Sequence, residues 1–479
     1  MKKILLSILT SVGLLGLASC SDFTDIKPKG SNLLQSVTDL EMLLNYEYSG
    51  IKASQVQLMA GDLYPMENIP TVISLPQTSL TKILTMWDET AHSREQIEQT
   101  SNDSHYTQFY YIIGRIANPI LMNIDGATGD ETLRRQVKCE ALVLRAYFHY
   151  LLVQKFARAY DPTYASTTLA IPYLYETQAL LETIPQLTLQ EVYTNILEDL
   201  DLAISLGGLP EEPVNHMRMG LPFAYAVKAM ALMSMQRFDD AADAAESSLA
   251  INPTISNYND LMVIQKGMLL KQDWPVVRRP FMDCPEDLFV TRDILDNTGL
   301  SAEAQARFED GHICRDRIIT DLVMFDYMMG RGKDLLGLDI PITYDFSPNW
   351  NSFGLKTAHM RLVLAECELH KGNINNAMEQ LDLLRVNRII TEKYSPLKGR
   401  VTTKDEAIRC LKQTSHGENI YSYYNFVNRK RWNQLDDYKE TLTRTVGDNV
   451  YTVSPESTMW IFPFPQNVIS LNPSIQQNY

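Results

Sequence analysis

Two stretches of this 479-residue chain repeat one pattern, and that pattern constrains the fold more than any other feature. Between Pro222 and Pro253, alanines and larger apolar residues recur every three or four positions, which is the period of one helix face. Residues 237–240, which read RFDD, interrupt the pattern and predict a tight turn. Residues 358–388 repeat the arrangement, with a turn at 371–373. Each stretch is therefore predicted to form two antiparallel helices of the tetratricopeptide kind.

Two less regular stretches predict further pairs. Residues 131–158 would form a long helix that pairs with 188–205, and residues 33–48 would pair with 106–124. One pair cannot bury its own apolar face, so the pairs must stack on one another. The predicted fold is therefore mainly α, with four tetratricopeptide-like helix pairs stacked as a superhelical scaffold.

Long segments interrupt this scaffold, at residues 50–105, 159–187, 252–355 and 389–479. A regular helical repeat does not need connections of this length. Long connections on a rigid scaffold are usually functional. We predict that these irregular, loop-rich insertions form the ligand side of the molecule.

The beginning of the chain predicts export and lipidation. An apolar run over residues 4–17 follows a basic start, which is the order of a secretory signal, and it is shorter than the roughly 20 residues that span a bilayer. Residues 17–20 read LASC and resemble the bacterial lipobox, whose cysteine is acylated after cleavage. We predict a signal peptide at 1–19, lipidation of Cys20 and a polar tether at 20–31. An ordinary signal peptide with an incidental cysteine is the alternative.

The charge and the cysteines exclude several classes of function. The net charge is −15, and loss of the leader would remove two lysines, so nucleic-acid binding is disfavoured, as is adhesion to anionic lipid apart from the anchor. Five cysteines remain after Cys20, widely spaced and without a C-x-x-C pair, so no metal site is predicted. Cys139 and Cys367 lie in apolar helical patterns and are predicted to be buried free thiols.

Four landmarks resemble those of a known family. Residues 111–118 resemble its Y-x-x-I-x-x-x-N helix, and residues 140–147 resemble its E-x-x-x-L-R-A-Y helix. Residues 429–432 resemble its late R-W segment, and residues 461–479 resemble its P-x-P … N-P-x-x-x-Q-N ending. With the lipobox, these landmarks resemble the SusD/RagB-like outer-membrane lipoproteins of Bacteroidetes over essentially the whole mature chain. Residues 405–428 depart from the family's E-R … E … E-G-x-R stretch.

The resemblance implies a lipoprotein of the outer-membrane surface. Such a protein would capture oligosaccharides and deliver them to a SusC-like TonB-dependent transporter, with its helix pairs facing the transporter. It implies one domain over 20–479, with three helix pairs in 32–251 and the fourth in 252–479. It implies no enzyme activity and no cofactor. A peptide-binding member of the family and a helical scaffold for envelope assembly are the alternatives. A lipid-anchored glycoside hydrolase would need two carboxylates about 5–10 Å apart in a cleft.

Aromatic residues in the insertions are the candidate ligand-binding residues. A ring can lie against the apolar face of a sugar while polar neighbours meet the hydroxyls. The candidates are Trp87, Asp88, Trp274, Trp350, Tyr64 and Tyr344. The alternative for each aromatic is that it anchors a long loop to the scaffold, since aromatic rings dominate cores. Arg145 and His149, in the long helix, are predicted to be structural.

Overall fold

The fold is seen in a computed structural model, which describes residues 34–48, 51, 53–65, 74–77, 79–91, 103–178, 183–265, 274–277, 284–291, 298–315 and 351–479. The predicted leader and tether, Cys20, Tyr344 and Trp350 lie outside the described residues.

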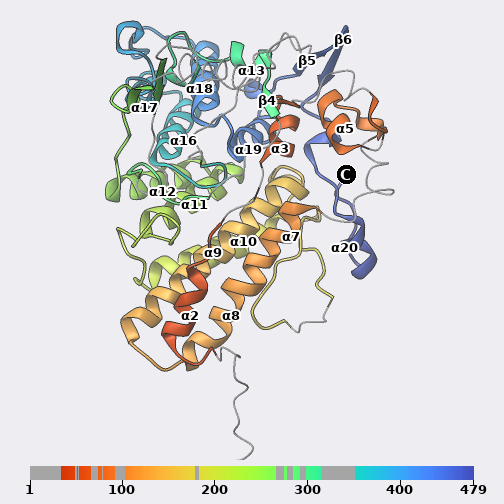
Figure 1. The fold of residues 1–479 in the computed structure, drawn as a ribbon, viewed down its shortest axis with the longest axis vertical. Helices are drawn as coiled ribbons and strands as arrows, with labels where there is room; N and C mark the ends of the chain where they lie inside the picture. Colours follow the sequence, from red (N-terminus) through yellow and green to blue (C-terminus); the bar gives the residue numbers. More distant parts are fainter. Residues whose placement is uncertain are drawn as a thin grey trace, which may run out of the picture.

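Paired helices build most of the described molecule (Figure 1). Helix α9 pairs with α10, α11 with α12, and α16 with α17, and successive pairs contact each other through α10 with α11 and α12 with α16. Their bounds are α9 (Glu131–Phe156), α10 (Leu189–Ser205), α11 (Leu221–Ser234), α12 (Phe238–Ile251), α16 (Thr357–His370) and α17 (Ile374–Arg385). The mainly α fold and these three predicted pairs are confirmed.

The N-terminal pair is less regular than the others. Helix α7 (Ser104–Ile112), the π-helical turn η1 (Ile113–Ala117) and α8 (Asn118–Asn123) follow one another directly and lead through η2 (Ile124–Gly126) towards α9. Helix α2 (Val37–Leu44) has eight residues and packs against both α8 and α9. The predicted contact between the two segments is confirmed, because α2 packs against α8. Helix α2 also packs against α9, so its buried face is shared between these two helices.

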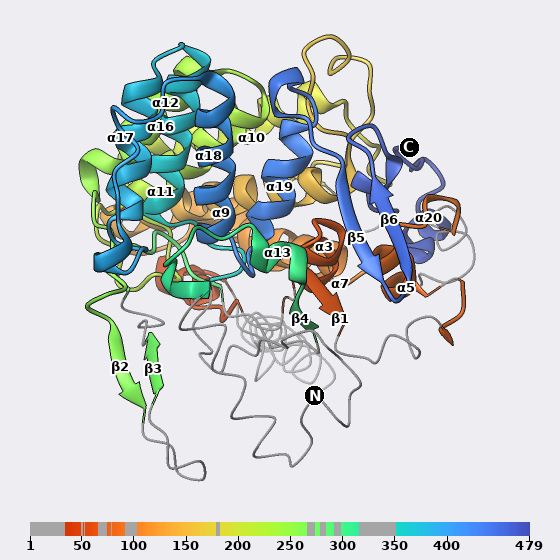
Figure 2. The same ribbon diagram turned by 90° about the horizontal axis from the view of Figure 1, so that it is seen from above.

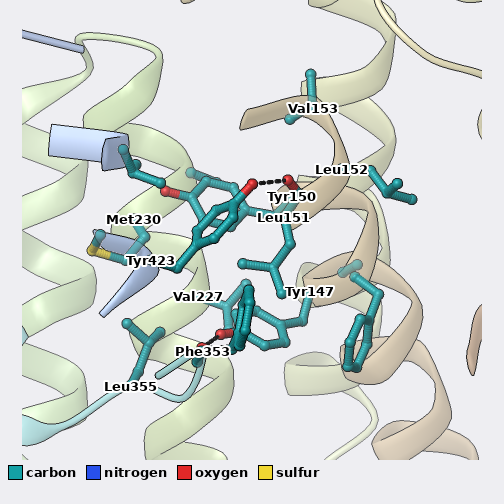
Figure 3. Packing of buried hydrophobic residues seen from close by; sticks show 14 of the residues in the cluster. Tyr147, Tyr150, Leu151, Leu152, Val153, Val227, Met230, Phe353, Leu355 and Tyr423 are labelled. Carbon is teal, nitrogen blue, oxygen red and sulfur yellow. Dashed lines mark hydrogen bonds between the residues drawn. The ribbon is translucent and has the colours of Figure 1, made fainter. Parts of the chain in front are cut away.

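Helix α9 lies at the centre of the described fold. It contacts α2, α7, α8, α10 and α11, and nearly every residue from Cys139 to its end is buried. Figure 3 shows Tyr147 and Tyr150 of α9 in one core with Val227 and Phe353, and Tyr423 reaching across to it. The Tyr423 hydroxyl donates to the Leu151 carbonyl at 2.8 Å. The core is therefore built around one helix rather than between two layers.

One predicted insertion is wrong in part. Residues 389–479 were expected to be irregular, but they contain α18 (Lys404–Glu418), which packs on α16 and α17, and α19 (Tyr423–Trp432), which contacts α3. Leu411 of α18 packs in a second apolar core, which also contains Leu381 of α17. The apolar pattern of α18 is weak because most of its buried residues are polar or glycine: Thr414, Ser415, His416, Gly417 and Glu418.

Short strands and helices occupy the insertions. Three antiparallel pairs are described: β1 (Leu63–Pro65) with β4 (Thr298–Leu300), β2 (Met262–Gln265) with β3 (Trp274–Val277), and β5 (Leu442–Val446) with β6 (Asn449–Val453). The remaining elements are α3 (Ser54–Met59), α5 (Leu80–Met86), α13 (Ala302–Ala306), η5 (Thr391–Lys393), η6 (Asp436–Tyr438), η7 (Thr458–Trp460) and α20 (Gln466–Leu471). In the part of the chain described, no helix has both the length and the apolar character needed to cross a membrane.

A buried ion pair joins α16 to the end of α19. Both terminal nitrogens of Arg431 donate to the Glu366 carboxylate, at 2.5 and 2.7 Å, and Trp432 Nε1 donates to it at 3.0 Å. Burial raises the pKa of Glu366, but the Arg431 guanidinium outweighs burial and lowers the pKa to about 2. The folded pKa lies below the ordinary value of 4.5, so the stability from this pair is present above pH 4.5 and is lost as the pH falls towards 2.

We expect Glu366→Gln to lower the free energy of unfolding at pH 7 by about 3–5 kcal/mol, because Arg431 would remain buried without its counter-charge. Urea unfolding at several pH values measures this, and the difference from the wild-type protein should shrink below pH 4.5. Glu379→Gln, at an ion pair half exposed on α17, is the matched control and should change stability by less than about 1 kcal/mol. Equal losses in the two variants would contradict the assignment.

Candidate ligand-binding side

Two of the described strand pairs lie in the same half of the molecule. In Figure 2, β1 with β4 and β2 with β3 lie away from α12 and α16, α13 lies next to β4, and β5 and β6 lie to the right. Helices α3 and α5 contact β1, and α5 also contacts β5. We refer to β1, β4, β2, β3, α3, α5 and α13 together as the insertion side.

The structure places the predicted residues in two parts of this side. Tyr64 lies in β1 opposite Gly299 of β4, and Trp87 is the C-cap of the neighbouring helix α5. Trp274 begins β3, opposite Gln265 of β2, and Figure 2 shows this hairpin well apart from β1. Tyr64 and Trp87 therefore come from adjacent elements, whereas Trp274 belongs to a separate hairpin.

The Trp87 ring is buried and holds the end of α5 against α3. Its side chain is 6% exposed, and its Nε1 donates to the Met59 carbonyl at 3.1 Å. The Arg444 guanidinium covers the ring, 4.4 Å from its centroid. In this conformation Trp87 offers no open face to a sugar. Its geometry is the anchoring arrangement that the sequence left as the alternative to ligand binding.

Arg444 is a residue that the sequence interpretation missed. One terminal nitrogen donates to the carbonyls of Leu84 and Thr85, at 3.1 and 2.8 Å, and the other donates to the Leu58 carbonyl at 2.7 Å. These carbonyls lie in the last turns of α5 and α3, where helices leave acceptors without a partner. The available signal was alternation, because β5 buries Leu442, Arg444 and Val446 on one face.

Asp88 organises the turn that follows α5. Its Oδ1 accepts from Thr90 Oγ1 at 2.6 Å and from the Ala91 amide at 3.1 Å. The next residue, Glu89, accepts from the Thr458 amide and hydroxyl at 2.8 and 2.6 Å. The loop after Trp87 is thus tied to the C-terminal part of the chain.

The two residues of α9 predicted to be structural are confirmed as such. Arg145 pairs with Asp199 of α10 through two contacts of 2.7 Å and also with Glu176. His149 Nδ1 donates to the Arg145 carbonyl at 2.8 Å, and its Nε2 accepts from the Leu174 amide at 3.0 Å. Burial lowers the pKa of His149 to about 3, so the ring stays neutral and holds one tautomer.

The cysteines also follow the prediction. Cys139 and Cys367 are buried free thiols, and burial raises the pKa of Cys367 to about 12. Searched over the described ranges only, no group of three histidine, cysteine, aspartate or glutamate side chains could hold a metal ion.

Comparison with proteins of solved structure identifies the fold of the chain. The chain has the fold of the SusD superfamily. A SusD-like carbohydrate binding protein from Bacteroides vulgatus is 14% identical, with a TM-score of 0.62 over 93% of this chain and 98% of its own. A SusD superfamily protein from Bacteroides thetaiotaomicron is 16% identical, with a TM-score of 0.60 over 93% and 100%. Surface glycan-binding protein A from Bacteroides uniformis is 16% identical, with a TM-score of 0.60 over 92% and 98%.

A family model matches the first half of the chain. Residues 22–232 match the SusD-like model that is described as starch-binding and associating with outer membrane. Over these residues the sequence is similar to the SusD-like family, and the fold is that of SusD-like proteins. No protein with a curated description matches the sequence.

We expect Trp87→Ala to lower the free energy of unfolding by about 3–5 kcal/mol, because it empties a site that joins α3, α5 and β5. Urea unfolding of residues 21–479 measures the loss. The control is Tyr111→Ala on α7, where the side chain is 50% exposed and truncation should change stability by about 0.5 kcal/mol or less. A Trp87→Ala protein as stable as the wild type would show that the ring is not an anchor.

Proposed function

We propose that this protein is a lipid-anchored binding protein of the outer-membrane surface, which captures oligosaccharides and delivers them to a SusC-like TonB-dependent transporter. The observation that carries the proposal is a SusD-like fold over more than nine-tenths of the chain, behind a lipobox-like leader. The proteins of similar structure include one described as carbohydrate binding and one described as glycan-binding. Binding rather than catalysis is the proposed activity.

The insertion side is the proposed ligand site. Trp274, Trp350, Tyr64 and Tyr344 would supply rings and Asp88 would supply a carboxylate, while Trp87 would act mainly by holding the loop in place. If a ring and a sugar face together remove about 100 Å² of apolar area from water, the gain is roughly 2.5 kcal/mol. Two such contacts and a few hydrogen bonds to the sugar hydroxyls, less the cost of association, give a Kd from about mM to tens of μM. Weak capture suits a protein that must release its cargo.

Calorimetric titration of residues 21–479 tests this proposal, with a panel of plant, mucin and microbial oligosaccharides that begins with maltoheptaose. We expect saturable binding, and we expect Trp274→Ala or Trp350→Ala to weaken it by about tenfold or more, since a lost ring contact exceeds 1.4 kcal/mol. Tyr111→Ala is the matched control, because it removes a half-exposed ring from α7 and should leave binding unchanged.

Other outcomes would point to the alternatives. Binding of mixed peptides without binding of any oligosaccharide would replace glycan capture with peptide capture. Binding of neither class would favour the scaffold for envelope assembly. A loss of binding in Tyr111→Ala equal to that in the tryptophan variants would contradict the placement of the site.

The anchor has a separate test in cells. We expect the full-length protein to incorporate labelled palmitate and to fractionate with the outer membrane, and we expect Cys20→Ser to abolish the labelling. Cys410→Ser changes a thiol that is only partly buried and is the control, which should keep the label. Labelling of the Cys20→Ser protein would contradict lipidation at that residue. Co-purification of a TonB-dependent transporter with the wild-type protein tests the proposed partner.

A further inference from the structure

A carboxylate without close partners lies at the base of the insertion side. Asp62, between α3 and β1, is 0% exposed. Its Oδ1 lies 3.7 Å from Arg307 Nη1, 3.7 Å from Arg429 Nη2 and 3.6 Å from His416 Nδ1. These distances are longer than direct hydrogen bonds between charged groups, which measure about 2.7–2.9 Å.

Four buried polar atoms face this space without a partner. Neither Asp62 oxygen, nor Arg307 Nη1, nor Arg429 Nε makes a hydrogen bond with any residue that the structure describes. Buried charged groups normally satisfy their hydrogen bonds with protein or ordered water. Polar groups more than 3.5 Å apart are the arrangement in which one small molecule bridges them.

His416 does not fill this role. Its Nε2 donates to the Ala304 carbonyl at 2.8 Å, and burial holds the pKa of the ring well below its ordinary value. Nδ1 of the neutral ring therefore carries no proton, and it accepts from Asn425 Nδ2 at 3.3 Å. The histidine orients the cluster but has no hydrogen to give to Asp62.

A hydroxyl group has the chemistry that the space requires. It can donate its hydrogen to the Asp62 carboxylate and accept hydrogens from the two guanidiniums at once. Burial raises the pKa of the Asp62 carboxyl, and Arg429, Arg307 and Asn425 lower it only in part. A hydrogen-bond donor would therefore stabilise the charged carboxylate in its buried position.

The place of the cluster connects it with the insertion side. The Ser301 amide donates to the Asp62 carbonyl at 2.9 Å, which fixes β4 and α13 next to β1. Gly61 lies against the Trp87 ring, since a methyl group there would come within 3.4 Å of it. The Arg307 side chain is 22% exposed, which makes it the most exposed of the four side chains in the cluster.

We propose that Asp62, Arg307 and Arg429 form a binding site for one hydroxyl group, filled by water in the empty protein and by a hydroxyl of the captured molecule in the loaded protein. The binding of a ligand hydroxyl at this site rests on the proposed function. Arg307 is the residue that would move to exchange one hydroxyl for the other, because its side chain is more exposed than that of Arg429 while both lie 3.7 Å from Asp62.

The first measurement is a crystal structure of unliganded residues 21–479 that shows ordered waters. We expect one water within about 3.2 Å of Asp62 and of both arginines. Direct contacts between the carboxylate and the guanidiniums, with no water between them, would overturn the inference. This measurement does not depend on glycan binding, so it stands if the proposed function fails.

The second measurement is titration of Arg307→Gln and Arg307→Lys with the oligosaccharides of the panel, beginning with maltoheptaose. We expect Arg307→Gln to weaken the affinity by about tenfold, the loss of one charged hydrogen bond, and Arg307→Lys to restore part of it. Arg237→Gln, at the N-cap of α12, where the side chain is 48% exposed, is the control and should bind as the wild type does.

The outcomes separate the two halves of the inference. An ordered water with unchanged affinity in Arg307→Gln would confirm a water site and overturn the ligand half. Failure of the wild-type protein to bind any oligosaccharide would overturn the ligand half together with the proposed function. Equal losses in Arg237→Gln and Arg307→Gln would overturn the assignment of Arg307 to the site.

Discussion

Helix α9 is buried together with charged side chains, and the elements around it are arranged to pair those charges. This 26-residue helix lies inside the protein for most of its length, and an unpaired charge there would be strongly destabilising. Each buried charge therefore has a partner from elsewhere in the chain. Glu140 binds Arg218 through contacts of 2.6 and 2.8 Å, Arg145 binds Asp199 of α10, and Lys155 donates to Asp103 at 2.7 Å. Asp103 also caps α7 by accepting from the Tyr106 amide.

These ion pairs also position segments of the chain around α9. Arg218 brings the loop before α11 onto α9, and Asp103 brings the start of α7 to the other end of the helix. At the end of α9, Lys430 of α19 donates to the carbonyls of Gln154 and Ala157, at 2.7 and 2.5 Å. A segment that carries the wrong partner would leave a buried charge alone, so the pairs select the arrangement of elements around α9.

Buried charges with close partners also attach the insertions to the helix pairs. Arg388, after α17, lies between Glu286 and Glu418, at 2.8 and 2.5 Å, and its guanidinium is 3.9 Å from the Tyr258 ring centroid. Arg444 attaches α3 and α5 to β5 by donating to their backbone carbonyls. These arginine contacts add to the apolar packing of the same segments, where Trp87, Phe289 and Phe353 are buried. The Asp62 cluster differs because its charges approach one another without closing the hydrogen bonds.

The helix pairs, the mainly α fold, the structural roles of Arg145 and His149 and the buried thiols of Cys139 and Cys367 could be predicted from the sequence. Apolar periodicity and helix caps are local properties, so neighbouring residues already contain them. The folded chain was needed to show that α18 is a helix with a polar buried face, that Trp87 lies under Arg444, and that Asp62 lies near two arginines. These features join residues hundreds of positions apart, and no local pattern states which distant charge or carbonyl will meet a given side chain.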